Sequence, residues 1–83
     1  MVIRPLSKKQ KRYLEKQNLV SVFEKQAELF QQNPRHPSLH TKVLEPKHFR
    51  LYSFRITHSV RAIFVYRGND EIEIMDINNH YND

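Results

Sequence analysis

The hydrophobic positions follow two periods along the chain, and the change between them separates a helical part from a sheet part. Before residue 33, apolar residues recur at helical spacing at Leu19, Phe23, Ala27 and Phe30. This stripe predicts an amphipathic helix of about four turns that Asn33-Pro34 stops. After residue 50, apolar and polar residues alternate one by one, as in strands with one buried face.

Local signals place the remaining elements and predict one α+β domain over residues 1–83. The pair Ser7 and Gln10 matches a capping box that opens a basic helix running to about Gln17, and Asn18 is expected to cap the next helix. The expected strands cover residues 1–3, 42–44, 52–57, 61–67 and 71–75, with turns at 58–59 and 68–70. The architecture is therefore an N-terminal strand and two helices packed on one face of a small antiparallel sheet.

The lengths of the two bends decide which strand residues share a face. Odd bends place an almost purely apolar set on one side: Tyr52, Phe54, Ile56, Ala62, Phe64, Tyr66, Ile72 and Ile74. The same register gathers the other set on the opposite face: Ser53, Arg55, Arg61, Arg67, Glu73 and Met75. Even bends would scatter the apolar residues, so burial favours odd bends. Asp76 is the exception, because this register puts its carboxylate on the apolar face.

Composition limits the function classes without choosing among them. The chain has 83 residues, 39% of them hydrophobic, which suffices for one modest core. No apolar run has the length of a signal peptide or a membrane span, and cysteine is absent, so we expect a cytoplasmic protein without disulfides or thiol chemistry. The net charge of +5 favours an anionic partner, although a solvated basic surface is an equal alternative.

The predicted arginine pair suggests a site for an anion. Arg55 and Arg61 become neighbours on the open face, and guanidinium groups bind phosphate in a planar, bidentate way. His80 could transfer a proton near neutral pH, and Tyr81 could stack on a base. The alternatives are structural: Arg61 pairs with Glu73 or Glu45, Arg55 pairs with a terminal carboxylate, His80 is solvated, and Tyr81 anchors the C-terminus.

Metal chemistry has little support in the sequence. His36 and His40 have helical spacing, but Pro34 and Pro37 make a helix there improbable, and no cysteine or carboxylate cluster accompanies them. We expect no cofactor. Metal-free RNA cleavage fits the remaining side chains, because the RNA supplies its own 2′-hydroxyl nucleophile.

The chain resembles the RelE/ParE superfamily of toxins from bacterial toxin–antitoxin pairs. The resemblance lies in Asn33-Pro34, Leu39, Leu44, the segments 51–56 (LYSFRI), 60–66 (VRAIFVY) and 72–77 (IEIMDI), and His80-Tyr81. It covers nearly the whole domain, and the terminal His-Tyr pair is most similar to the YoeB-like branch.

This resemblance implies a ribosome-dependent endoribonuclease that cuts mRNA in the decoding site. It implies catalytic roles for Arg61, His80 and Tyr81, and a phosphate-binding role for Arg55. The YoeB-like general base is a glutamate; an ungapped alignment puts Lys42 at its position, with Glu45 three residues later. Glu45 therefore serves after a small shift, or lysines such as Lys42 and Lys47 replace it as in RelE-like enzymes, or activity is weakened.

The implied substrate-binding residues are Arg55, Lys42, Lys47 and Arg67. The implied partners are a cognate antitoxin and ribosome-bound mRNA, with no membrane, in a homodimer or a toxin–antitoxin hetero-oligomer. Two alternatives share the fold: a ParE-like toxin that inhibits DNA gyrase through protein contacts, and a non-catalytic module that docks an antitoxin-like peptide.

Overall fold

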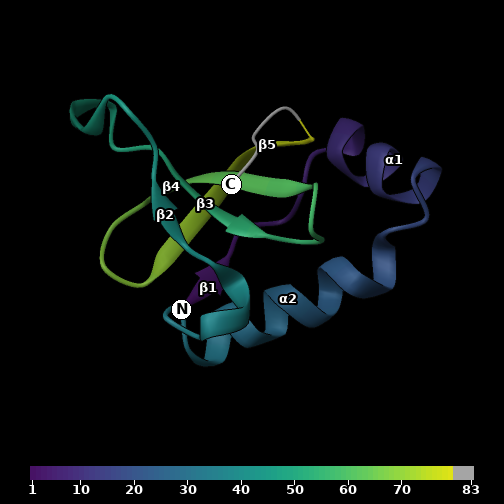
Figure 1. The fold of residues 1–83 in the computed structure, drawn as a ribbon, viewed down its shortest axis with the longest axis horizontal. Coiled ribbons are helices and arrows are strands. Elements are labelled where there is room, and N and C mark those ends of the chain that lie inside the picture. The colour runs from purple at the N-terminus through teal and green to yellow at the C-terminus, as the bar shows by residue number, and fades with distance from the viewer. Residues whose placement is uncertain (80–83) are drawn as a thin grey trace.

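The structure, a computed structural model, describes residues 1–79 and forms the predicted α+β arrangement (Figure 1). The helices are α1 (Lys8–Lys16) and α2 (Val20–Gln32). The strands are β1 (Val2–Ile3), β2 (Lys42–Val43), β3 (Tyr52–Arg55), β4 (Arg61–Tyr66) and β5 (Glu71–Asn78). They form one sheet in the order β1-β5-β4-β3-β2, antiparallel except for the pair β1 and β5.

The first helix begins as the sequence predicts, whereas the second does not. The Ser7 hydroxyl accepts from the Gln10 amide and the Gln10 side chain accepts from the Ser7 amide, which completes the capping box. Leu19, not Asn18, is the N-cap of α2. Asn18 instead adopts a left-handed conformation with φ 60°, which asparagine tolerates better than most residues, and it ends α1.

The predicted apolar stripe of α2 forms the core against the sheet. Phe23, Ala27 and Phe30 are buried. The Phe30 ring stacks on Phe54 at 5.1 Å between centroids and meets the edge of Phe64 at 5.2 Å. Rings in these two geometries gain about 0.5–1.5 kcal/mol per pair beyond simple burial. This core holds the helices on one face, and within residues 1–79 the other face carries no α-helix (Figure 1).

The predicted register of β3 and β4 is confirmed. Phe54 pairs with Ala62, and Arg55 lies directly opposite Arg61. The two bends span residues 57–59 and 68–70, an odd number each, since the Ile56 amide donates to the Val60 carbonyl and the Arg67 amide to the Glu71 carbonyl. Both arginines therefore lie on the face away from the helices.

A β-bulge in β5 overturns the prediction for Asp76. The register between β4 and β5 shifts at Ile63/Phe64, so that Phe64 pairs with Ile74 but Ile63 pairs with Asp76. Met75 is the inserted residue, and beyond it every side chain changes face. Ile77 is buried at 4% exposure opposite Ala62, whereas Asp76 lies on the face that carries Arg55 and Arg61.

Candidate active site

Arg61 is the central residue of the face away from the helices, and it is buried. Its exposure is 2%, and Nε donates to the Ser53 hydroxyl at 2.9 Å. Nη2 donates to the His40 carbonyl and, at 3.5 Å, to the Ser53 carbonyl. Because these acceptors come from β3 and from the segment before β2, the guanidinium is fixed on two sides. A charge so shielded from water attracts an anion more strongly than one in solvent.

The backbone at His40 is shaped for this contact. His40 ends the 3-10 helix Pro37–Leu39 in a left-handed conformation with φ 45°, which turns the chain into β2. A non-glycine residue in this region carries strain, and such strain often occurs at functional positions. His40 thus contributes to the Arg61 site through its carbonyl, a role that its side-chain chemistry did not suggest.

Arg55 is positioned through its own backbone. Its carbonyl accepts from the buried Gln26 side chain at 2.8 Å, and Gln26 also donates to the Ser38 carbonyl at 3.3 Å. This bond ties the end of β3 to α2, next to the place where Arg55 and Arg61 stand side by side. The two arginines are direct cross-strand neighbours, which is an arrangement in which two guanidinium groups can contact one anion.

The structure separates the three candidates for the general base. Lys42 pairs with Ser53, whose hydroxyl accepts from Arg61. It therefore lies on the face of Arg61, in the cross-strand row next to the Arg55–Arg61 pair. Glu45 lies past the end of β2, exposed, three residues farther from this row. Lys47 starts a short 3-10 helix, Lys47–Phe49, that projects beyond the sheet at the upper left of Figure 1. Of the three, only Lys42 lies beside the arginine pair.

Arg67 shares the face of Arg61 but lies at the other end of β4. Six residues of strand separate the two, about 20 Å. Arg67 Nε contacts the Glu73 carboxylate at 2.8 Å, and Arg4 contacts the same oxygen at 3.4 Å. Glu73 pairs with Val65, about 13 Å along β4 from Arg61, so the expected alternative of an Arg61–Glu73 ion pair is wrong.

Asp76 is the functional candidate that the sequence prediction missed. Its place opposite Ile63 puts it diagonal to Arg61, about 7–8 Å away between Cα atoms. Its carboxylate accepts from the Ile77 amide at 2.9 Å and from the Asn78 side chain at 2.6 Å. A signal did exist: the apolar positions Ile72, Ile74 and Ile77 break the period of two by one residue, which is the mark of a bulge.

Two of the predicted catalytic residues, His80 and Tyr81, lie outside the described residues, as does the expected terminal carboxylate partner of Arg55. Among residues 1–79, no three histidine, aspartate or glutamate side chains converge in the manner of a metal site. Neither helix in this part of the chain has the length and apolar character needed to cross a membrane.

Comparison with known proteins agrees with this geometry at the level of the fold. A YoeB/ParE toxin from Agrobacterium tumefaciens superimposes with a TM-score of 0.72 at 17% identity, and the match covers 96% of each chain. The fold is that of the YoeB and ParE toxins. A YoeB–YefM toxin–antitoxin heterotetramer from Staphylococcus aureus also contains this YoeB fold, with a TM-score of 0.69, 18% identity, and coverage of 96% of this chain and 94% of that one. No protein-family model matches the sequence, and no curated protein gives a significant match.

Proposed function

We propose that this protein is the toxin of a toxin–antitoxin pair and cleaves mRNA on the ribosome. The observation that carries the proposal is the Arg61 site: a guanidinium of 2% exposure, fixed by Ser53 and the His40 carbonyl, directly opposite Arg55. A fixed cation that is shielded from water suits a reaction whose charge grows on a phosphate, because it needs no reorganisation when that charge appears. The YoeB and ParE fold supports the toxin role.

The proposed reaction is transfer of the phosphate to the neighbouring 2′-hydroxyl of the RNA. The 2′-oxygen attacks phosphorus and gives up its proton to a base, while the bond from phosphorus to the 5′-oxygen breaks and that oxygen receives a proton from an acid. The products are a 2′,3′-cyclic phosphate and a free 5′-hydroxyl. Arg61 stabilises the charge on the non-bridging oxygens, and Arg55 holds the phosphate beside it.

Position favours Lys42 over Glu45 for a role at the reacting atoms. Lys42 lies next to Ser53 and its bonded guanidinium, whereas Glu45 would need the chain past β2 to fold back toward this row. Asp76, on the other side of Arg61, is a second group that could take up a proton. We retain His80 and Tyr81 as proposed catalytic residues on the resemblance to YoeB-like toxins; by their chemistry, His80 would transfer the proton and Tyr81 would stack on a base.

The proposed partners follow from the same fold. The Staphylococcus aureus structure is of YoeB bound to its YefM antitoxin, and we propose that a cognate antitoxin silences the present protein in a similar hetero-oligomer. Ribosome-bound mRNA is the proposed substrate, and the cytoplasm is accordingly the proposed place of action. The net charge of +5 suits both partners, since mRNA is anionic and an acidic antitoxin segment would be complementary.

Translation-coupled cleavage, mapped by primer extension on a translated message, tests this proposal. Arg61→Gln keeps a side chain that can donate to Ser53 but removes the charge, so cutting should fall at least about a hundredfold while the fold survives. Arg12→Gln, an equal loss of charge on the exposed side of α1, should cut normally. Equal cutting by the two variants would refute the Arg61 assignment. Gyrase inhibition without any RNA cut by the wild-type protein would favour the ParE-like alternative instead.

A further inference from the structure

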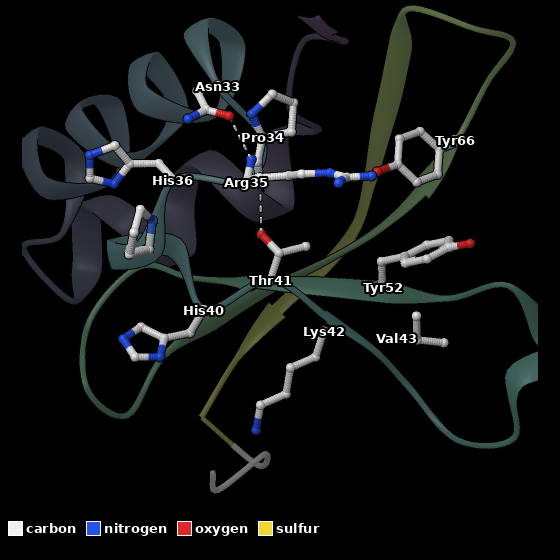
Figure 2. A pocket seen from close by; sticks show the side chains of 11 residues that line it. Asn33, Pro34, Arg35, His36, His40, Thr41, Lys42, Val43, Tyr52 and Tyr66 are labelled. Carbon is white, nitrogen blue, oxygen red and sulfur yellow. Dashed lines mark hydrogen bonds between the residues drawn. The ribbon is translucent and has the colours of Figure 1, made fainter.

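Two cavities outside the Arg55–Arg61 pair adjoin each other around Tyr52 and Tyr66. The larger, about 660 Å³, lies between the end of α2 and the sheet, and Figure 2 shows it from close by. The smaller, about 450 Å³, lies between the projecting turn at Phe49 and the bend at Gly68. Both tyrosines line both cavities. We call the two neighbouring cavities together the tyrosine groove.

The groove exists because α2 stops before it covers the whole apolar face. Tyr52 and Tyr66 lie on the same side of the sheet as Phe64, but α2 ends at Gln32, and Tyr66 keeps 41% exposure. The two tyrosine rings meet edge to face at 4.9 Å. Phe49, at the far wall, is 61% exposed. The sequence prediction placed both tyrosines under the helices, and the exposure of Tyr66 corrects it.

Basic and neutral polar residues line the two cavities beside these rings. The lining includes the basic residues Arg35, Lys42, Arg50 and Arg67 together with His36 and His40. No aspartate or glutamate lines either cavity among the described residues. In Figure 2 the Arg35 side chain extends along the groove toward the Tyr66 hydroxyl. Its charge lowers the pKa of Tyr66, although burial, with a smaller contribution from Tyr52, raises that pKa overall.

We propose that the tyrosine groove binds a single-stranded segment of RNA, with a base stacked on Tyr66 and a phosphate at Arg35. Exposed aromatic faces alternating with cations are the surface that binds single strands irrespective of sequence, since every base has a π-face. The absence of acidic lining residues and the net charge of +5 fit an anionic strand along its whole length.

Edge strand β2 connects the groove to the Arg61 site. Lys42 lines the larger cavity and also pairs with Ser53, the residue bonded to Arg61 on the other face. A strand whose phosphate is held at Arg61 can therefore cross β2 and lay its flanking nucleotides in the groove. This inference rests on the proposed function for the identity of the strand as message, but the groove binds RNA whether or not the phosphate is cut.

Binding of a 2′-O-methylated oligouridine of about eight nucleotides tests the groove separately from cleavage, because the methyl group removes the nucleophile. Fluorescence anisotropy should show Tyr66→Leu binding roughly five- to a hundredfold more weakly than wild type, the loss expected for one stacked base. Tyr66→Phe keeps the ring and should bind like wild type. Arg35→Gln should also weaken binding and reduce the slope of log Kd against log salt by about 0.7, the share of one phosphate contact. Arg12→Gln, outside the groove, is the matched control.

The outcomes separate this inference from the proposed function. Oligouridine binding by Tyr66→Leu and Arg35→Gln equal to wild type would overturn the groove, whatever happens to cleavage. If the same substitutions weakened the binding of an acidic peptide such as polyglutamate more than the binding of RNA, the RNA assignment would be overturned in favour of a protein partner. A third outcome is possible: the wild-type protein binds the oligonucleotide, the two variants do not, and the wild type cuts no message. This result would support the groove and count against the nuclease. Melting temperatures near that of the wild type establish that the variants are folded.

Discussion

Replacing Ser53 with alanine tests whether the hydrogen bond that fixes Arg61 matters for chemistry. Ser53 is fully buried, and its hydroxyl accepts from Arg61 Nε at 2.9 Å. The substitution deletes the oxygen without adding bulk, so the strand pairing with Ile63 and Lys42 should persist. What changes is that a charged N–H, shielded from water, loses its acceptor.

The size of the effect follows from that loss. A hydrogen bond to a charged group contributes about 1.5–3 kcal/mol, and a buried donor left without an acceptor carries a similar cost. The free energy of unfolding should therefore fall by about 1.5–3 kcal/mol, measured by urea denaturation. If the bond also holds the guanidinium where the phosphate charge develops, the same energy slows cutting roughly ten- to a hundredfold.

Two measurements on each variant decide between stability and orientation. Cutting is followed by primer extension under conditions in which the variant is fully folded, so that lower stability cannot imitate lower activity. Ser21→Ala, on the exposed side of α2, is the control; alanine is the better helix former, so neither quantity should fall. A Ser53→Ala protein that unfolds at wild-type urea concentrations and cuts at the wild-type rate would refute the role given to this bond.

Three further predictions follow from single features of the site. Lys42→Ala should reduce cutting, measured by primer extension, at least about tenfold more than Glu45→Ala does. The reason is that, of the two, only Lys42 lies beside Ser53, which holds Arg61. The reverse order would restore Glu45 as the base. His40→Gly should keep cutting and gain up to about 1 kcal/mol in urea denaturation, since the carbonyl is retained and glycine adopts positive φ without strain; loss of cutting would mean that the imidazole acts. Partial burial raises the pKa of Tyr66, so the folded chain keeps a proton that the unfolded chain releases, and stability should fall as pH rises above 10. Thermal melts across that range should show a smaller fall in Tyr66→Phe; equal pH profiles would contradict the raised pKa.

The parts of the fold that were predictable are those in which burial enforces a repeat. The alternation in β3 and β4 decides which residues share a face, and any register that keeps Phe54 and Phe64 inside puts Arg55 and Arg61 together on the other face. The capping box needs only two residues at fixed spacing, and its hydrogen bonds are local. Such features depend on few contacts, and short stretches of sequence contain them.

The parts that escaped prediction depend on contacts between distant segments. Residues 33–50 have no period, so nothing in them indicates that the His40 carbonyl reaches Arg61, twenty-one positions along the chain. Arg61 is also buried at 2% exposure, which was not expected of an open face. The bulge at Met75 depends on how β4 and β5 fit together, and a single inserted residue was enough to move Asp76 from one face to the other.

Residues on one face of the sheet contribute mainly to stability, and those on the other face contribute to the proposed function. Edge strand β2 lies next to both faces. Substitutions in the apolar stripe of α2 should act on activity only through the amount of folded protein, because Phe30 and its neighbours contact the face opposite Arg61. The opposite face, by contrast, carries Arg55 and Arg61 side by side. Lys42 lies both in the row beside Arg61 and in the lining of the tyrosine groove. A substitution at Lys42 should therefore weaken cutting and oligonucleotide binding together, whereas Arg61→Gln and Tyr66→Leu should each affect chiefly one of the two.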